Sequence, residues 1–153
     1  MTELLAPAGD LEAGYAALAY GADAVYLGLT RFSARAEATN FTPEALKTFT
    51  AFAHAKGKRV LVAVNTVIFD EELDGLIDTL CAVKDAKADG VIVQDLGTAR
   101  IIRKYFPTLR LHGSTQMAVH NREGVEALRD MGFKRVVLAR ELTLDEIRDI
   151  CSV

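Results

Sequence analysis

KADGVIVQD, residues 87–95, is the stretch that decides the fold of this chain. A helix-ending segment runs straight into the apolar residues 91–93, and polar Gln94 and Asp95 follow them directly. GADAVYLG (21–28) and GFKRVVLAR (132–140) have the same order of helix exit and apolar strand. Strands that are apolar without strict alternation are typical of parallel sheets, where both faces are buried. The repeat therefore predicts βα units joined by right-handed crossovers.

Six apolar runs are expected to form the strands of this sheet: 3–7, 24–28, 59–65, 90–95, 109–113 and 135–140. Helical segments fill the gaps between them, and most begin at a residue whose side chain accepts a hydrogen bond from the first helical turn. These expected caps are Asp10, Thr42 (before Pro43), Asp95, Asn121, and Thr143 in a capping box with Glu146. A further helix is expected to begin at Asp70.

Two architectures are compatible with such units, an open doubly wound sheet and a (β/α)₈ barrel of the TIM type. The first strand–helix turn, APAGDLEAG (6–14), lacks both GxGxxG and GxxxxGK[ST], so no nucleotide-binding fingerprint supports the open sheet. The strands end in small or polar residues, as they do at the catalytic rim of a barrel. We therefore expect a TIM-barrel-like, incomplete α/β fold of about six βα units.

A complete barrel has eight strands and about 250 residues, which is more than this chain provides. Residues 1–153 are accordingly interpreted as a single domain, the amino-terminal fragment of a larger barrel-containing protein. An open barrel leaves two unpaired strand edges, which would pair with missing strands or with another copy in a homo-oligomer.

Composition excludes several classes of function. The formal net charge is −3, so no global basic field points to nucleic acid, although a local basic groove stays open. The sequence shows neither a signal peptide nor an apolar run long enough to span a membrane, which predicts a cytoplasmic protein. Cys81 and Cys151 lie far apart and form no metal-binding or disulfide pattern. No metal site is expected within the chain.

Polar residues close nearly every predicted strand, and parallel strands bring their carboxyl ends together at one rim. Each of these residues also has a structural interpretation. Asp95 can be only a helix cap, Asn65 and Gln94 can bond loop backbone, and His112 can be a satisfied strand residue. Ser114 lies in no GxSxG elbow, which argues against a serine hydrolase. Arg140 and Glu141 are adjacent on a strand end and are expected to point to opposite faces.

The loop RFSARAEATNF (31–41) interleaves basic and aromatic residues. Arg31 and Arg35, with Phe32 and Phe41, could stack on and neutralise a nucleic-acid strand. A solvated loop is the favoured interpretation.

Three stretches carry a resemblance to a known family. ELLAPAGD (3–10) with GADAVYLG and RFSARAEATNF, then HGSTQMAVHN (112–121), then RVVLARELTLDEI (135–147) occur in this order. Together they resemble the collagenase-like peptidases, unclassified peptidase family 32, over nearly the whole chain. The resemblance implies the amino-terminal part of a barrel-like catalytic domain. It also carries over the positions Tyr26, Arg31, Ser33, Arg35, Asn40, Asn65, Gln94, Asp95, His112, Ser114, Gln116, Asn121, Arg140 and Glu141.

The resemblance leaves three functional hypotheses open. The first is a collagenase-like peptidase acting on peptides. The second is a hydroxylase of RNA bases or quinone rings whose iron–sulfur cluster is bound by cysteines outside this chain. The third is a truncated, non-catalytic domain. We expect His112, Asp95 and Glu141 to be the catalytic candidates, and the substrate-binding candidates to be Tyr26, Arg31, Arg35, Asn65, Gln94, Ser114, Gln116, Asn121 and Arg140.

Overall fold

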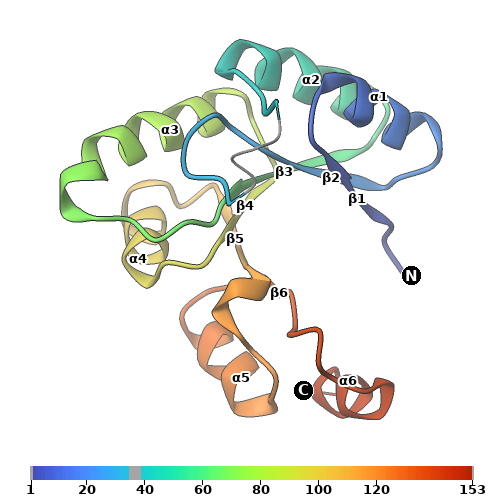
Figure 1. The fold of residues 1–153 in the computed structure, drawn as a ribbon, viewed down its shortest axis with the longest axis vertical. Helices are drawn as coiled ribbons and strands as arrows, with labels where there is room; N and C mark the ends of the chain where they lie inside the picture. The colour runs from blue at the N-terminus through green and yellow to red at the C-terminus, as the bar shows by residue number, and fades with distance from the viewer. Residues whose placement is uncertain (1, 35–38, 153) are drawn as a thin grey trace.

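A computed structural model describes residues 2–34 and 39–152. Strands and helices alternate along the chain (Figure 1). The elements are β1 (Leu5–Ala8), α1 (Leu11–Ala19), β2 (Ala24–Gly28), α2 (Pro43–Ala55), β3 (Arg59–Val64), the 3₁₀ turn η1 (Asp70–Glu72), α3 (Leu73–Asp85), β4 (Gly90–Val93), α4 (Leu96–Tyr105), β5 (Arg110–Gly113), the 3₁₀ turn η2 (Thr115–Met117), α5 (Arg122–Asp130), β6 (Arg135–Val136) and α6 (Leu144–Ile150).

The strands form one six-stranded sheet in the order β1-β2-β3-β4-β5-β6, and every neighbouring pair is parallel. A doubly wound sheet would reverse the direction of strand order at a switch point. Here each crossover proceeds in the same direction, as in a TIM barrel. The expected incomplete barrel is therefore confirmed as six parallel strands that form part of a barrel wall.

The last strand is shorter than expected. The sequence predicts a strand over 135–140, but β6 pairs with β5 only through Arg135 and Val136. Beyond it, Val137 N donates to Gly113 O, and Ala139 N donates to Val119 O in the segment after η2. The chain thus leaves the sheet and follows the segment after η2, and no strand within the described residues pairs with the outer edge of β6.

Most helix starts match the expected caps. The side chains of Asp10, Thr42, Asp95 and Asn121 each accept a hydrogen bond from the backbone three residues later, and Thr143 with Glu146 forms the capping box of α6. The expected helix start at Asp70 differs, because residues 70–72 form the 3₁₀ turn η1 and the α-helix begins at Leu73. No helix in the described ranges is long and apolar enough to cross a membrane.

Alternate residues of each strand face opposite sides of the sheet. Val25, Val60, Val62, Val91 and Leu111 pack in one buried apolar cluster with residues of α2, α3 and α4. The intervening residues face the inside of the barrel wall and line cavities there: Tyr26, Leu61, Ala63, Ile92 and His112. Buried apolar side chains therefore hold the helices against the outer face, and the inner face is left for a site.

Candidate functional site

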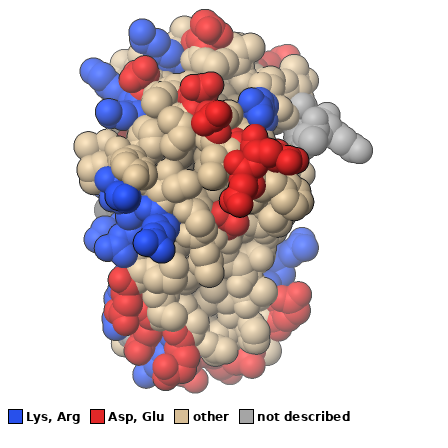
Figure 2. Space-filling view, turned by 90° about the vertical axis from the view of Figure 1, so that its left-hand side faces the viewer, with Lys and Arg blue, Asp and Glu red and all other residues tan. Residues whose placement is uncertain are grey.

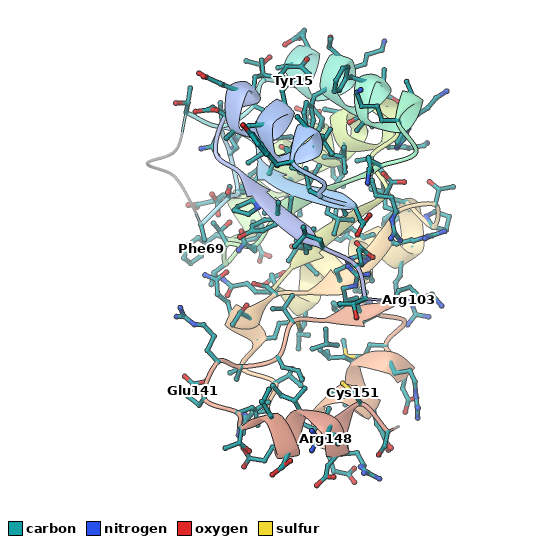
Figure 3. The ribbon with its side chains drawn as sticks, turned by 90° about the vertical axis from the view of Figure 1, so that its right-hand side faces the viewer. Tyr15, Phe69, Arg103, Glu141, Arg148 and Cys151 are labelled. Carbon is teal, nitrogen blue, oxygen red and sulfur yellow. The ribbon has the colours of Figure 1, made fainter. Side chains whose placement is uncertain are left out.

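A cavity of about 680 Å³ lies at the carboxyl ends of the strands. Its lining comes from all six strands or the loops that follow them: Leu5, Ala8, Gly9, Tyr26, Leu27, Gly28, Ser33, Ala34, Asn40, Ala63, Asn65, Ile92, Ser114, Thr115, Gln116, Ala118, Val137, Ala139, Arg140 and Glu141. We call it the rim pocket. In Figure 3, Phe69 (after β3) and Glu141 (after β6) project to the same side, and Arg103 lies on the other side of the molecule.

Six of the predicted site residues line the rim pocket: Tyr26, Asn65, Ser114, Gln116, Arg140 and Glu141. The apolar floor, formed by residues such as Leu5, Ile92 and Val137, was missed by sequence reasoning. Strand alternation could have found Ile92, because Val91 and Val93 on either side of it pack against the helices and Ile92 must face the other way. The functional roles of these residues stay predictions.

A chain of hydrogen bonds orients two amide side chains in the rim pocket. Ala34 N donates to Asn65 Oδ1 at 3.1 Å, and Asn65 Nδ2 donates to Gln116 Oε1 at 2.8 Å. Because a backbone N–H can only donate, the Asn65 atom that faces Ala34 N must be the oxygen. The Asn65 NH₂ group then faces Gln116, so the Gln116 atom that it meets must be the oxygen Oε1. Ser114 Oγ also donates to Gln116 Oε1, at 3.3 Å. The Gln116 NH₂ group consequently keeps both donors available, with no acceptor in the described part of the chain.

The loop after β2 is anchored at both ends beside this amide pair. Asn65 N donates to Phe32 O, and Phe41 N donates to Gly28 O. Gly28 permits the close approach, because a Cβ atom there would clash with Ser33 and lie 2.8 Å from Asn40 Oδ1. The two polar loop residues Ser33 and Asn40 reach the pocket lining because β2 ends in glycine.

Arg140 and Glu141 both border the rim pocket, and neither belongs to a strand, so the basis for expecting opposite faces is absent. Strand alternation does not apply, because β6 ends at Val136 and the two residues lie in a turn. The pocket therefore combines one cation and one carboxylate at the same edge.

Five of the predicted site residues that the structure describes lie outside the lining, and three of them follow strands or cap helices near it. Asp95 Oδ1 accepts from Thr98 N at 2.6 Å and caps α4, and Asn121 Oδ1 accepts from Gly124 N at 2.8 Å and caps α5. Gln94 follows β4 but is not part of the lining. The structural interpretation of Asp95 as a helix cap is thus confirmed.

His112 does not lie at the rim, contrary to expectation. It is 7% exposed within β5 and lines a separate cavity at the amino ends of the strands. Burial, and then the guanidinium group of Arg135, lower the pKa of His112 to about 4. The structure does not bring His112, Asp95 and Glu141 together.

The positions of the loop residues do not support the hypothesis that this loop binds a nucleic-acid strand. Phe32 and Phe41 are buried, so neither ring is available to stack on a base. The Arg31 guanidinium lies 4.8 Å from the centre of the Phe32 ring and packs on Gly75 of α3, outside the rim pocket. Arg35 lies outside the described residues.

Neither cysteine is placed to hold an iron–sulfur cluster. Cys81 on α3 and Cys151 after α6 are exposed free thiols. Among the residues that the structure describes, no group of three His, Cys, Asp or Glu side chains is arranged to hold a metal ion. The four thiolates that such a cluster needs are not supplied by this chain.

Comparison with known proteins identifies the family. The model of peptidase family U32 matches residues 9–153, nearly the whole chain. The chain belongs to peptidase family U32. The resemblance seen in the sequence is thereby confirmed.

Curated relatives include proteins of different activities. This U32 chain is 40% identical over 148 residues to the tRNA hydroxylation protein P of Escherichia coli, covering 97% of this chain and 33% of the relative. It is 39% identical over 148 residues to the 23S rRNA 5-hydroxycytidine synthase of the same organism, covering 97% of this chain and 22% of the relative. It is 34% identical over 149 residues to a collagenase of Porphyromonas gingivalis, covering 97% and 35%. The chain spans about a third or less of these relatives.

The fold is similar to that of solved barrel proteins. A solved structure of a U32 peptidase superposes with a TM-score of 0.78 at 16% identity, covering 99% of this chain and 65% of that one. Phosphoribosyl anthranilate isomerase from Thermotoga maritima superposes with a TM-score of 0.58 at 16% identity, covering 91% and 64%. At these identities the likeness supports the TIM-barrel-like fold alone.

Proposed function

We propose that this U32 chain is the base-binding part of an enzyme that hydroxylates a base of transfer or ribosomal RNA. The observation that carries the proposal is the identity of 39–40% to two RNA-hydroxylation proteins across 97% of the chain. The relatives named as proteases lie on both sides of this value, at 41% for an uncharacterized protease of Methanocaldococcus jannaschii and 34% for the collagenase, so identity does not separate the two activities. The rim pocket supplies the physical argument for an RNA base.

The rim pocket is large enough for an unstacked base with its ribose, and its lining suits the edge of a base. About 680 Å³ lies within the usual range for a small-molecule site. The lining combines apolar residues with uncharged amide and hydroxyl groups, which match the hydrogen-bonding edge of a neutral base. The free Gln116 NH₂ group would donate to a ring carbonyl or ring nitrogen, and Asn65 would hold Gln116 in that orientation.

Arg140 gives the pocket edge a group for the RNA backbone. A guanidinium group pairs well with phosphate oxygens, and Arg140 lies in the lining beside the uncharged groups. On the face in Figure 2, acidic and basic side chains gather in separate groups, and no basic surface extends across it. The formal net charge is −3, so RNA contact at the pocket edge would be local and depend on few cations. We assign the binding and orientation of the base to Asn65, Gln116 and Arg140. We assign no redox step to these residues.

Peptide hydrolysis is the second candidate, because two relatives carry protease names, the collagenase and the uncharacterized protease of Methanocaldococcus jannaschii. Ser114 Oγ donates to Gln116 Oε1 and Ser114 accepts from Gln116 N, so this hydroxyl has no imidazole base in the described residues. Glu141 is the carboxylate in the lining. A hydrolytic mechanism would need further groups beyond these.

The test is a binding comparison with two candidate substrates. Fluorescence anisotropy of the 153-residue chain is measured with a labelled transfer-RNA stem–loop and with labelled denatured collagen. We expect RNA binding that weakens about tenfold in Arg140→Gln, since one phosphate contact is lost. Arg148→Gln on α6 is the matched control and should bind as the parent does. Binding or cleavage of collagen without RNA binding would instead establish the peptidase reading.

A further inference from the structure

A second cavity, of about 110 Å³, lies at the opposite end of the barrel wall from the rim pocket. Its lining residues lie within β3, β5 and β6 or just before β1, β4 and β6: Glu3, Arg59, Leu61, Asp89, Arg110, His112, Lys134 and Arg135. We call it the amino-end pocket. It shares no lining residue with the rim pocket.

Both carboxylates of the amino-end pocket are already paired. Glu3 Oε1 and Oε2 accept from Arg135 at 3.2 and 2.7 Å, and Glu3 Oε2 also accepts from Arg59 at 2.6 Å. Asp89 Oδ2 accepts from Val60 N at 2.7 Å and lies 2.9 Å from His54 Nε2. The acidic groups therefore have little capacity left for further cations.

Two cations of the same lining have no such partner. The side chains of Arg110 and Lys134 make no hydrogen bond or ion pair with any described residue. Four cationic side chains thus face two carboxylates in this pocket, and the uncompensated charge is positive. Arg110 and Lys134 are exposed, and a small open pocket with excess positive charge favours an anion.

His112 provides an independent observation at the same place. Its side chain is 7% exposed, and its Nδ1 is buried with no hydrogen-bond partner within residues 2–34 and 39–152. Buried ring nitrogens are almost always hydrogen-bonded to protein, water or a ligand. Because Nδ1 is fully buried, an occupant of the cavity can meet only the other ring nitrogen, Nε2, which makes no hydrogen bond to a described residue.

We propose that the amino-end pocket binds one small tetrahedral oxyanion of the phosphate or sulfate class. The Arg110 guanidinium and the Lys134 ammonium groups supply the charge, and a ring N–H of neutral His112 supplies a donor. The cavity volume suits a single such ion and leaves no room for a nucleoside. The site is independent of the RNA proposal, because it lies at the other end of the strands from the rim pocket.

Histidine NMR on the 153-residue chain tests the proposal directly. Inorganic phosphate, then sulfate, is titrated at constant ionic strength held with sodium chloride, and the ring resonances of His112 are followed. We expect saturable shifts at millimolar concentrations, and a His112 pKa that rises when the ion is bound, because a bound anion favours the imidazolium form. His112→Gln identifies the resonances.

Matched variants separate the pocket from the general surface. Arg110→Gln and Lys134→Gln are each expected to weaken phosphate binding about tenfold, the effect of one charged hydrogen bond. Arg100→Gln on α4 and Lys84→Gln on α3 carry the same changes on exposed surface and should bind as the parent does. Shifts that sodium chloride reproduces, or that spare His112 while other resonances move, would overturn the proposal.

Discussion

His112 is the residue whose environment departs most from its ordinary chemistry. Burial and the guanidinium groups of Arg135, Arg110 and Arg59 lower the pKa of His112 from 6.5 to about 4, against the opposite effect of the Glu3 carboxylate. A general acid–base at neutral pH needs a pKa near the working pH, so this imidazole is poorly suited to that role. It is suited to be a neutral donor in the amino-end pocket.

The same shift makes stability depend on pH. Between pH 6.5 and about 4 the unfolded chain protonates His112 and the folded chain does not, so the folded state loses stability as pH falls. We expect a loss on the order of 2 kcal/mol over this window. Urea unfolding at several pH values should show this slope in the parent and in His120→Gln. A slope unchanged in His112→Gln would contradict the assignment.

Gln116 is the residue that we expect to donate a hydrogen bond to the base of the substrate in the rim pocket. Gln116→Leu removes the free NH₂ group and the acceptor of Asn65, so affinity for a ribonucleoside should fall about tenfold. Isothermal titration calorimetry measures the change. Gln94→Leu is the matched control, because Gln94 follows a neighbouring strand outside the pocket lining. Equal losses in both variants would argue against a specific contact by Gln116.

At the scale of elements, Asp95 joins β4 to α4 as a helix cap. Asp95→Ala removes the acceptor for Thr98 N and should cost about 1 kcal/mol of unfolding free energy, measured by urea denaturation. Asp95→Asn keeps a capping oxygen and should stay near the parent in both stability and ligand binding. If Asp95→Asn lost ligand binding at unchanged stability, the carboxylate would have a role in the site.

Gly28 decides how the loop after β2 packs on the sheet. Gly28→Ala places a methyl group against Ser33 and Asn40, both of which line the rim pocket. Overpacking of this kind typically costs about 1–3 kcal/mol. We expect the variant to fold with reduced stability and weaker ligand binding. Gly97→Ala at the start of α4 is the control, because a Cβ there meets only the Asp95 side chain at 3.1 Å.

At the scale of the whole molecule, one carboxylate ties the two ends of the sheet together. Glu3 precedes β1, yet it pairs with Arg59 at the start of β3 and Arg135 at the start of β6. These ion pairs span the inside of the barrel wall, where β1 and β6 themselves make no pair. The hydrogen bond from Arg135 lowers the pKa of Glu3, so this stabilisation is lost as pH falls through that lowered value.

Glu3→Gln should therefore reduce unfolding free energy by about 1–3 kcal/mol, since two arginines lose their partner in a half-buried setting. Asp145→Asn is the control: it breaks the Arg148 pair on α6, whose side chains are 75% and 87% exposed, and should change stability by less than about 0.5 kcal/mol. Thermal unfolding by circular dichroism compares the two. Similar effects would show that Glu3 does not tie the sheet ends.

The edges of β1 and β6 are the remaining feature at this scale. Pairing of these edges with another copy or with further strands stays a prediction. Light scattering of the 153-residue chain checks it, and a monodisperse monomer would argue against pairing between copies.

The sequence by itself determined the elements, their order and the family. Apolar runs without alternation specify parallel strands, and each capping side chain bonds a backbone N–H only three residues away. Both signals lie within short segments, so they can be recognised in the sequence. The convergence of Tyr26, Asn65, Ser114 and Gln116 on one pocket also followed, because parallel strands place their carboxyl ends at one rim.

Only the tertiary structure decided which of these polar groups are free to act. His112 and Ser114 are two residues apart, yet one lines the amino-end pocket and the other the rim pocket. Arg140 and Glu141 lie in a turn and not on a strand, because Ala139 N donates to Val119 O and the chain no longer pairs with β5. Which pocket a residue lines, and where a strand ends, depend on partners far away in the chain. A short sequence pattern therefore cannot predict burial or pairing across the barrel.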